Sequence, residues 1–361
     1  MSHYEERLEQ DLDKIREHIA TMADKVEEAL KNAVRALQTG DRQLASTTIL
    51  ADHEVNRSMR EIDRLCHAFI AVHLPSAGHL RLLSSAIRAN IEIERIGDYA
   101  VTVARVSQQL AAPPEGTMAR ELERIASEAQ LMLRQAISSF KELNADVAKA
   151  TMVMEREMEY DLEGIYGELT ANEDRERVRE LLAVFAVFTH LKRVADQAKN
   201  LCEETVFAAT GETKAPKVYN ILFVDEDNSL FGQMAEAVAC KNYPGSGQYR
   251  SVGRQPAKEL NAAMVQFMEQ HGFDLREARP KPMDLTNKDL IEKHLIISLQ
   301  GPVKEYFATL PFHTTGLEWE VGAAAAGGDE AGTTQQLEAV YGEIAVRVRD
   351  LMATLRGADA P

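Results

Sequence analysis

Apolar residues in the first part of the chain recur at intervals of three and four positions. The first such series comprises Leu8, Leu12, Ile15, Ile19, Met22, Val26, Leu30, Ala33 and Leu37. This spacing places the apolar side chains on one narrow face of a long amphipathic helix. Gly40 and Asp41 follow, a glycine suited to end one helix and an aspartate suited to cap the next. We therefore predict a helix that ends near residue 40 and a second that starts directly after it.

The same periodicity predicts two sets of three helices. The second helix extends to about residue 73 and the third runs from residue 75 to about 110, where prolines at 113 and 114 break the pattern. A further set covers about 118–142, a fifth helix that contains Glu155 and Glu159, and about 175–209. Residues 91–101 and 190–200 are similar to each other at corresponding places of the two sets. We assign an internal repeat of two all-α three-helix units, 1–112 and 117–212.

The pattern changes after a linker at 210–217. Short, β-rich apolar runs occur at 219–224 and 294–299, and the helical periodicity returns at 233–240 and 262–271. An amphipathic helix at 335–356 follows an Ala/Gly-rich stretch. Strands and helices in alternation favour an α/β domain with a small parallel sheet, here over 218–356.

Composition and charge narrow the classes of function. Hydrophobic residues make up 45% of the chain and charged residues 27%, which is ordinary for a globular protein. The net charge of −16 disfavours nonspecific binding to nucleic acid, because such binding depends on basic residues that neutralise phosphates. The chain begins with polar, acidic residues and contains no apolar run of the ~20 residues that span a membrane. We expect a cytoplasmic protein without membrane insertion.

The three cysteines are interpreted as free thiols. Cys66, Cys202 and Cys240 lack the spacing of metal ligands, and each falls on an apolar phase of a predicted helix. Three buried thiols in a reducing compartment are therefore expected, with no disulfide.

An acidic pair in the third predicted helix is the main candidate for chemistry. Glu94 and Asp98 are four positions apart, so they lie on one helical face, one turn from each other. Both can stay ionised only if a cation or a basic side chain lies between them. A metal ion is one interpretation; a salt-bridge network with Arg95 and neighbouring helices is the other. The sequence leaves both open.

The first two-thirds of the chain resembles the PhoU family, the cytoplasmic accessory and regulatory proteins of phosphate-specific transport. The similar residues are 92–98, the upstream stretch 74–81, and 161–166 in the second repeat. The resemblance implies two three-helix bundles side by side, metal binding, and a homodimer. It also implies two partners, the phosphate-transporter ATPase and a phosphate-sensing histidine kinase, both restrained when phosphate is plentiful.

The resemblance also implies a set of metal ligands. The positions that match the family pattern are Glu94, Asp98, Asp52, Glu155, Glu159 and Asp196. Asn56 stands where Asp or Asn is usual and so fits the pattern. Two positions depart from it: His79 stands where Asp is common, and Lys192 where Glu is expected. The Lys192 ammonium lies one turn from Asp196 and can neutralise it, which favours one competent metal cluster rather than two. Oxygen ligands favour Mg, Mn, Fe or Ca over Zn.

The C-terminal part resembles the low-molecular-weight tyrosine phosphatases and arsenate reductases. The similar residues are 221–224 leading into Asn228 and Ser229, 233–237, 251–256 and 268–275. Enzymes of that family use a cysteine nucleophile and, after five intervening residues, an arginine that binds the oxyanion. Here Asp225 and Phe231 occupy those two positions, and Trp319 is followed by Glu320 without the Asp-Pro of the family's general acid. We expect a domain without catalytic activity.

These observations lead to one main hypothesis and one alternative. We expect a metal-binding adaptor that negatively regulates phosphate uptake and phosphate-starvation signalling. The alternative is a phosphatase or arsenate reductase with altered chemistry. A ferritin-like di-iron enzyme is disfavoured, because it requires a glutamate three residues before a histidine and no histidine of the chain has one.

Overall fold

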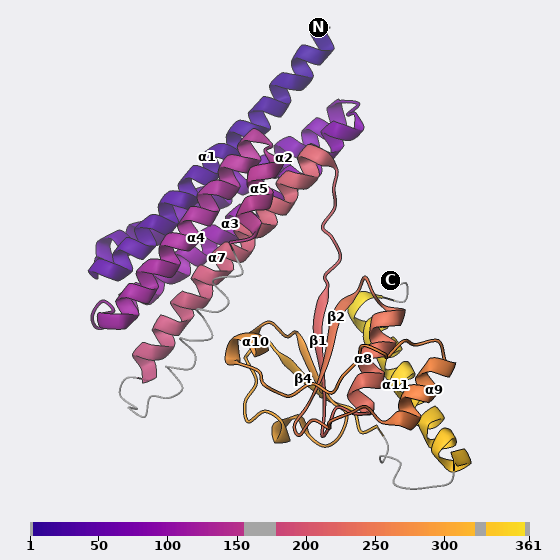
Figure 1. Ribbon diagram of the computed structural model, residues 1–361. Helices are drawn as coiled ribbons and strands as arrows, with labels where there is room; N and C mark the ends of the chain where they lie inside the picture. The colour runs from indigo at the N-terminus through magenta and orange to yellow at the C-terminus, as the bar shows by residue number, and fades with distance from the viewer. Residues whose placement is uncertain (1–2, 155–177, 322–329, 358–361) are drawn as a thin grey trace. The chain divides into compact units, whose positions relative to one another are not determined.

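The chain forms two compact units, Met1–Lys214 and Ala215–Pro361. The computed structural model describes residues 3–154, 178–321 and 330–357 (Figure 1). The first unit is helical and the second is an α/β domain. The predicted fold class, an all-α part followed by an α/β part with a small parallel sheet, is confirmed.

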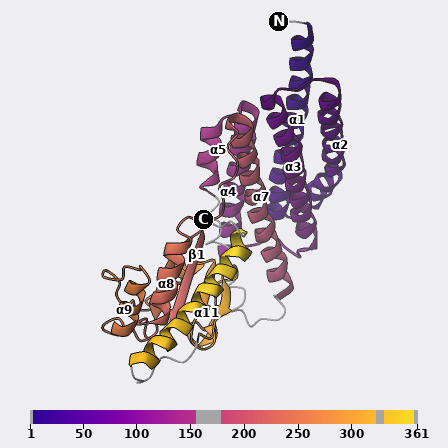
Figure 2. The same ribbon diagram turned by 90° about the vertical axis from the view of Figure 1, so that its right-hand side faces the viewer.

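Long helices make up the described part of the first unit (Figures 1 and 2). They are α1 (His3–Thr39), α2 (Arg42–Val72), α3 (Ala77–Gln109), α4 (Gly116–Glu142), α5 (Ala145–Met152) and α7 (Val178–Thr210). Asp41 caps α2 as predicted, because its side chain accepts a hydrogen bond of 2.9 Å from the Leu44 amide. The predicted continuation of the fifth helix through Glu155 and Glu159 lies outside the described residues.

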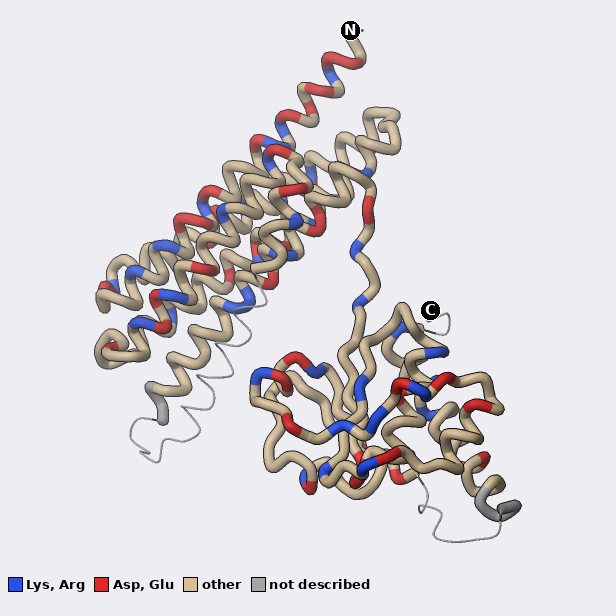
Figure 3. Tube along the Cα trace, viewed as in Figure 1, with Lys and Arg blue, Asp and Glu red and all other residues tan. Residues whose placement is uncertain are grey.

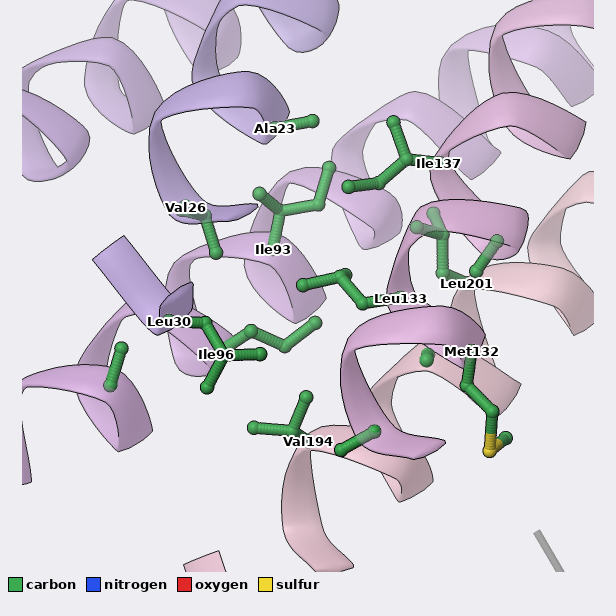
Figure 4. Packing of buried hydrophobic residues seen from close by; sticks show 14 of the residues in the cluster. Ala23, Val26, Leu30, Ile93, Ile96, Met132, Leu133, Ile137, Val194 and Leu201 are labelled. Carbon is green, nitrogen blue, oxygen red and sulfur yellow. The ribbon is translucent and has the colours of Figure 1, made fainter. Parts of the chain in front are cut away.

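One apolar core joins the helices of the first unit. Side chains from α1, α3, α4 and α7 converge in it, and Figure 4 labels Ala23, Val26, Leu30, Ile93, Ile96, Met132, Leu133, Ile137, Val194 and Leu201. The predicted repeats therefore do not have separate cores: α3 belongs to the first repeat and α7 to the second, and these two helices pack extensively against each other.

Gly97 marks a close approach of α3 to α1 and α2. A Cβ atom added there would lie 3.5 Å from Val26 Cγ2 and from Val55 Cγ1, which is ordinary van der Waals contact. Because alanine favours the helix by about 1 kcal/mol over glycine, we expect Gly97→Ala to leave stability unchanged or to raise it by up to about 1 kcal/mol. Gly97→Val would overpack the same contact and should cost about 1–3 kcal/mol. Urea unfolding of both variants checks this, and a strongly destabilised alanine variant would contradict it.

The second unit is built on a parallel four-stranded sheet of order β2-β1-β3-β4. The strands are β1 (Tyr219–Asp225), β2 (Gly247–Gly253), β3 (Leu295–Ser298) and β4 (Thr315–Glu318). The helices are α8 (Phe231–Asn242), α9 (Ala262–Gln270), α10 (Asn287–Ile291) and α11 (Glu330–Arg356), with a 3₁₀ turn at Val303–Glu305. Figure 1 shows α8, α9 and α11 on one side of the sheet and α10 on the other.

Alternate residues of β1 and β3 face the two sides of this sheet. Ile221 and Phe223 pack in the larger cluster with α8, α9, α11 and Trp319. Leu222 and Val224 pack in a smaller cluster with Leu290 and with Val303 of the 3₁₀ turn. Burial on both faces explains why β1 and β3 are continuous apolar runs. Among the described helices of the chain, none is long and apolar enough to cross a membrane.

Candidate functional site

Three carboxylates predicted as metal ligands lie near one another at the contact of α2 and α3. Asp52 comes from α2, and Glu94 and Asp98 come from successive turns of α3. Gly97 of α3 lies at the same contact, since a Cβ atom on it would be 3.8 Å from Asp52 Oδ1, an ordinary van der Waals distance. Asp52 and Glu94 are half-buried and Asp98 is exposed. Glu94 and Asp98 are thus one turn apart on α3, as predicted, and Asp52 of the neighbouring helix α2 adds a third acid to the group.

The three acids repel one another. Burial raises the pKa of Glu94, and the negative charges of Asp98 and Asp52 raise it further. Burial also raises the pKa of Asp52, with a further contribution from Asp98, while His53 and Arg105 oppose the rise. Mutual repulsion of partly desolvated carboxylates favours the binding of a cation that would neutralise them.

The polar partners of this group are few. Asn56 Nδ2 donates a hydrogen bond of 2.7 Å to Asp52 Oδ2, while Asp52 Oδ1 is buried and has no hydrogen-bond partner within the described residues. The Arg95 guanidinium lies 3.8 Å from Glu92, and among the described residues no basic side chain forms an ion pair with Glu94 or Asp98. The salt-bridge network that we considered as the alternative is thus not formed around the acidic pair in this part of the chain.

The chemical type of the donor atoms suits a hard metal ion, but among the described residues these atoms do not form a complete coordination site. Carboxylate oxygens are the ligands that Mg, Mn, Fe and Ca prefer, and the unpartnered Asp52 Oδ1 is available to a cation. The described residues do not bring three carboxylate, imidazole or thiol groups into a metal-binding arrangement. Glu155 and Glu159, also predicted as ligands, lie outside the described residues.

The acid of the second repeat is neutralised within its own helix. Lys192 Nζ lies 2.8 Å from Asp196 Oδ1, as the one-turn spacing suggested. His190, in the same helix, is half-buried against the Tyr99 ring, and burial and Arg193 lower its pKa. His79 caps α3 through reciprocal hydrogen bonds with Ser76, so it serves the helix end rather than the acidic group.

The cysteines follow the prediction except at one position. Cys66 and Cys202 are buried free thiols, and burial raises the pKa of each to about 12. Cys240 is exposed, so the expectation that it is buried was wrong. It directly follows Ala239, one of the α8 residues that pack on the sheet, and lies beyond the edge of that buried face.

In the second unit the loop after β1 holds a buried carboxylate. Asp225 is fully buried, and burial raises its pKa to about 6. The amide of Asn228 donates to Asp225 Oδ1 at 2.9 Å, and the amide of Gly232, at the start of α8, donates to Oδ2 at 2.8 Å. Phe231 is buried in the apolar cluster below the loop. The positions of Asp225 and Phe231 are evident from the sequence, whereas the two amides that bind the carboxylate are evident only from the folded loop.

Comparison with known proteins shows which family the first unit resembles. A family model described as "PhoU domain" matches residues 19–107 and 122–205. The phosphate-specific transport system accessory protein PhoU homolog of Pseudomonas aeruginosa is 29% identical over 212 residues, which are 58% of this chain and 88% of the relative. The crystal structure of PhoU from Pseudomonas aeruginosa matches with 30% identity and a TM-score of 0.55, and covers 56% of this chain and 99% of its own. The chain belongs to the PhoU family. The resemblance stated from residues 74–81, 92–98 and 161–166 is confirmed.

The second unit of this PhoU-family protein has fold neighbours of its own. An arsenate reductase structure in its phosphate-binding state is 20% identical and covers 38% of this chain and 99% of its own, with a TM-score of 0.31. The small parallel sheet predicted for this unit is confirmed.

Proposed function

We propose that this chain is an accessory and regulatory protein of phosphate transport. The observation that carries the proposal is the match to PhoU of Pseudomonas aeruginosa along 99% of that chain. Relatives from several bacteria, among them Escherichia coli, bear the name phosphate-specific transport system accessory protein. In finer terms, we propose a cytoplasmic homodimer that restrains the phosphate-transporter ATPase and a phosphate-sensing histidine kinase when phosphate is plentiful.

Replacement of a bacterial phoU gene by the gene for the full chain tests this proposal. Cells that lack their own PhoU should regain phosphate-controlled uptake and repression of the starvation response. The tagged full chain should also retain the transporter ATPase or the kinase on an affinity column, and light scattering should give the mass of a dimer. Failure to restore regulation, at expression levels equal to those of the native protein, would contradict the accessory role.

We further propose that Asp52, Glu94 and Asp98 hold a divalent or trivalent metal ion. The ion would supply positive charge that offsets the repulsion raising the pKa values of Glu94 and Asp52. The chain's own residues supply hard oxygen donors, of which Asp52 Oδ1 has no other partner among the described residues. Asn56 orients Asp52 by occupying its second oxygen.

Neutralising the acidic pair is expected to remove metal binding and, without metal, to stabilise the protein. In Glu94→Gln/Asp98→Asn the repulsion disappears, so the apo variant should be slightly more stable than the wild type at neutral pH, by less than about 1 kcal/mol. Manganese should raise the unfolding midpoint of the wild type but not of the variant. Elemental analysis and thermal unfolding with and without a chelator provide the measurements.

A matched control removes the same charge elsewhere on the helical unit. Glu17 and Glu28 lie on exposed positions of α1. Glu17→Gln/Glu28→Gln should therefore bind metal as the wild type does. Equal metal content in the wild type and in Glu94→Gln/Asp98→Asn would show that the ligands are wrong, while leaving the accessory role untouched.

We propose that the second unit is not a phosphatase or reductase. A carboxylate that accepts two backbone hydrogen bonds stands at the position of the family's nucleophile, and a buried phenyl ring stands at the position of the oxyanion-binding arginine. Neither group can provide a thiolate or a guanidinium. The full chain should not hydrolyse a phosphotyrosine mimic above the background of an Asp225→Ala variant. Turnover that disappears with Asp225 would instead favour the altered-chemistry alternative.

A further inference from the structure

The loop between β1 and α8 is shaped to surround a negative charge. Asn228 adopts a left-handed backbone conformation with φ of 52°. The amides of Asn228 and Gly232 both point at one carboxylate. Gly232 lies in the first turn of α8, a helix of 12 residues, whose free amides carry partial positive charge. Such an arrangement of amides binds oxyanions.

A further polar group is directed into the same space. Asn228 is fully buried, and its Oδ1 accepts hydrogen bonds from Gln233 Nε2 and from the Lys281 amide. Its Nδ2 has no hydrogen-bond partner among the described residues. A Cβ atom added to Gly232 would lie 2.6 Å from this Nδ2 and 3.2 Å from Asp225 Oδ1, which places the amide group beside the carboxylate. The loop therefore presents three N–H-bearing groups around one acidic side chain.

The loop is also held rigidly from outside. The carbonyl oxygens of Asp225, Glu226, Asp227 and Ser229 each accept a hydrogen bond from the segment between Arg254 and Asn261. Gly253 allows this close approach, since a Cβ atom on it would lie 2.8 Å from the Asn228 nitrogen. With its carbonyls engaged outward, the loop keeps its amides directed inward whether or not an anion is present.

We propose that this loop is an oxyanion-binding loop that the chain has filled with its own carboxylate. Asp225 is a built-in ligand: each of its oxygens occupies an amide that a tetrahedral oxyanion such as inorganic phosphate would require. The loop thereby keeps a pre-formed anion site closed to free phosphate. This inference is independent of the regulatory role proposed for the helical unit, because it concerns only the second unit.

Removal of the built-in carboxylate tests the proposal in the full chain. Asp225→Ala frees the amides of Asn228 and Gly232, and inorganic phosphate should then bind to one site at least about tenfold more tightly than to the wild type. Calorimetry measures the affinity and stoichiometry. Asp227→Ala is the matched control: it removes an equal charge from the same loop, but the Asp227 carboxylate accepts from the Ser229 amide and not from the amides of Asn228 and Gly232. It should leave phosphate binding as weak as in the wild type.

Two results would overturn the inference. If Asp225→Ala and Asp227→Ala gain phosphate affinity equally, general repulsion rather than occupation of the amides excludes phosphate. If wild-type protein binds phosphate as tightly as Asp225→Ala, the site is not closed. Should Asp225→Ala fail to fold, hydrogen exchange of the wild type decides. The amides of Asn228 and Gly232 should be protected and should not shift when phosphate is added, whereas exchange as fast as that of exposed amides refutes the proposal.

Discussion

Ile96→Ala is expected to lower the free energy of unfolding of the helical unit by about 2–5 kcal/mol. Ile96 is fully buried, and it lies in the core where side chains of α1, α3, α4 and α7 meet (Figure 4). Loss of its branched side chain removes apolar contacts and leaves a cavity that long, closely packed helices cannot collapse to fill. Because the core is shared by both repeats, we expect them to lose structure in a single transition.

Two optical probes make this result specific. Far-UV circular dichroism is dominated by the long helices of the first unit, whereas Trp319, the chain's single tryptophan, is buried in the second unit beside Phe223 and reports on that unit by fluorescence. Urea should shift only the helical transition in the Ile96→Ala variant. Leu50→Ala, at an exposed position of α2, is the control and should change stability by no more than about 0.5 kcal/mol. Two separate helical transitions would show that the repeats have independent cores.

The helical part of the fold was predictable because a single pattern dominates it. Every residue of the first apolar series, from Leu8 to Leu37, is buried in α1. Strands β1 and β3 were also recognised, because burial on both faces makes them apolar throughout. Strands β2 and β4 were missed. The sequence of β2 contains Gln248 and Arg250, and β4 lies at the sheet edge with mostly exposed residues, so neither shows an apolar run.

The distribution of charge along the chain does not by itself reveal the candidate site. Figure 3 shows acidic and basic residues interspersed along the helices. The one-turn spacing of Glu94 and Asp98 identifies a pair, but the approach of Asp52 depends on the contact between α2 and α3 at Gly97. Similarly, the sequence shows that Asp225 replaces a cysteine. That its carboxylate accepts from Asn228 and Gly232 depends on backbone directions, which side-chain patterns do not report.

Stability of the second unit is expected to fall between mildly acidic and neutral pH on account of Asp225. Burial is the main cause that raises the Asp225 pKa from 3.8 to about 6, and the nearby charge of Asp227 adds to it, while the amide of Gly232 opposes it. The folded state therefore holds the proton more tightly than the unfolded chain. The stabilisation from protonation is complete below the unfolded pKa and is lost as the pH rises through the folded pKa. Between about pH 5 and pH 7.5 the loss should reach about 1–1.5 kcal/mol.

Other groups titrate over the same range, so the comparison must be made with a variant that lacks only this proton. Asp225→Asn keeps the shape of the side chain and removes its titration. Urea unfolding followed by Trp319 fluorescence at several pH values gives the difference in stability between the wild type and this variant. The stability of the wild type relative to the variant should fall as the pH rises, because only the wild type must keep a buried charge. A difference that is constant with pH would contradict the prediction. It would mean that the Asp225 pKa is the same in the folded and unfolded protein, because the amide hydrogen bonds fully offset the effect of burial.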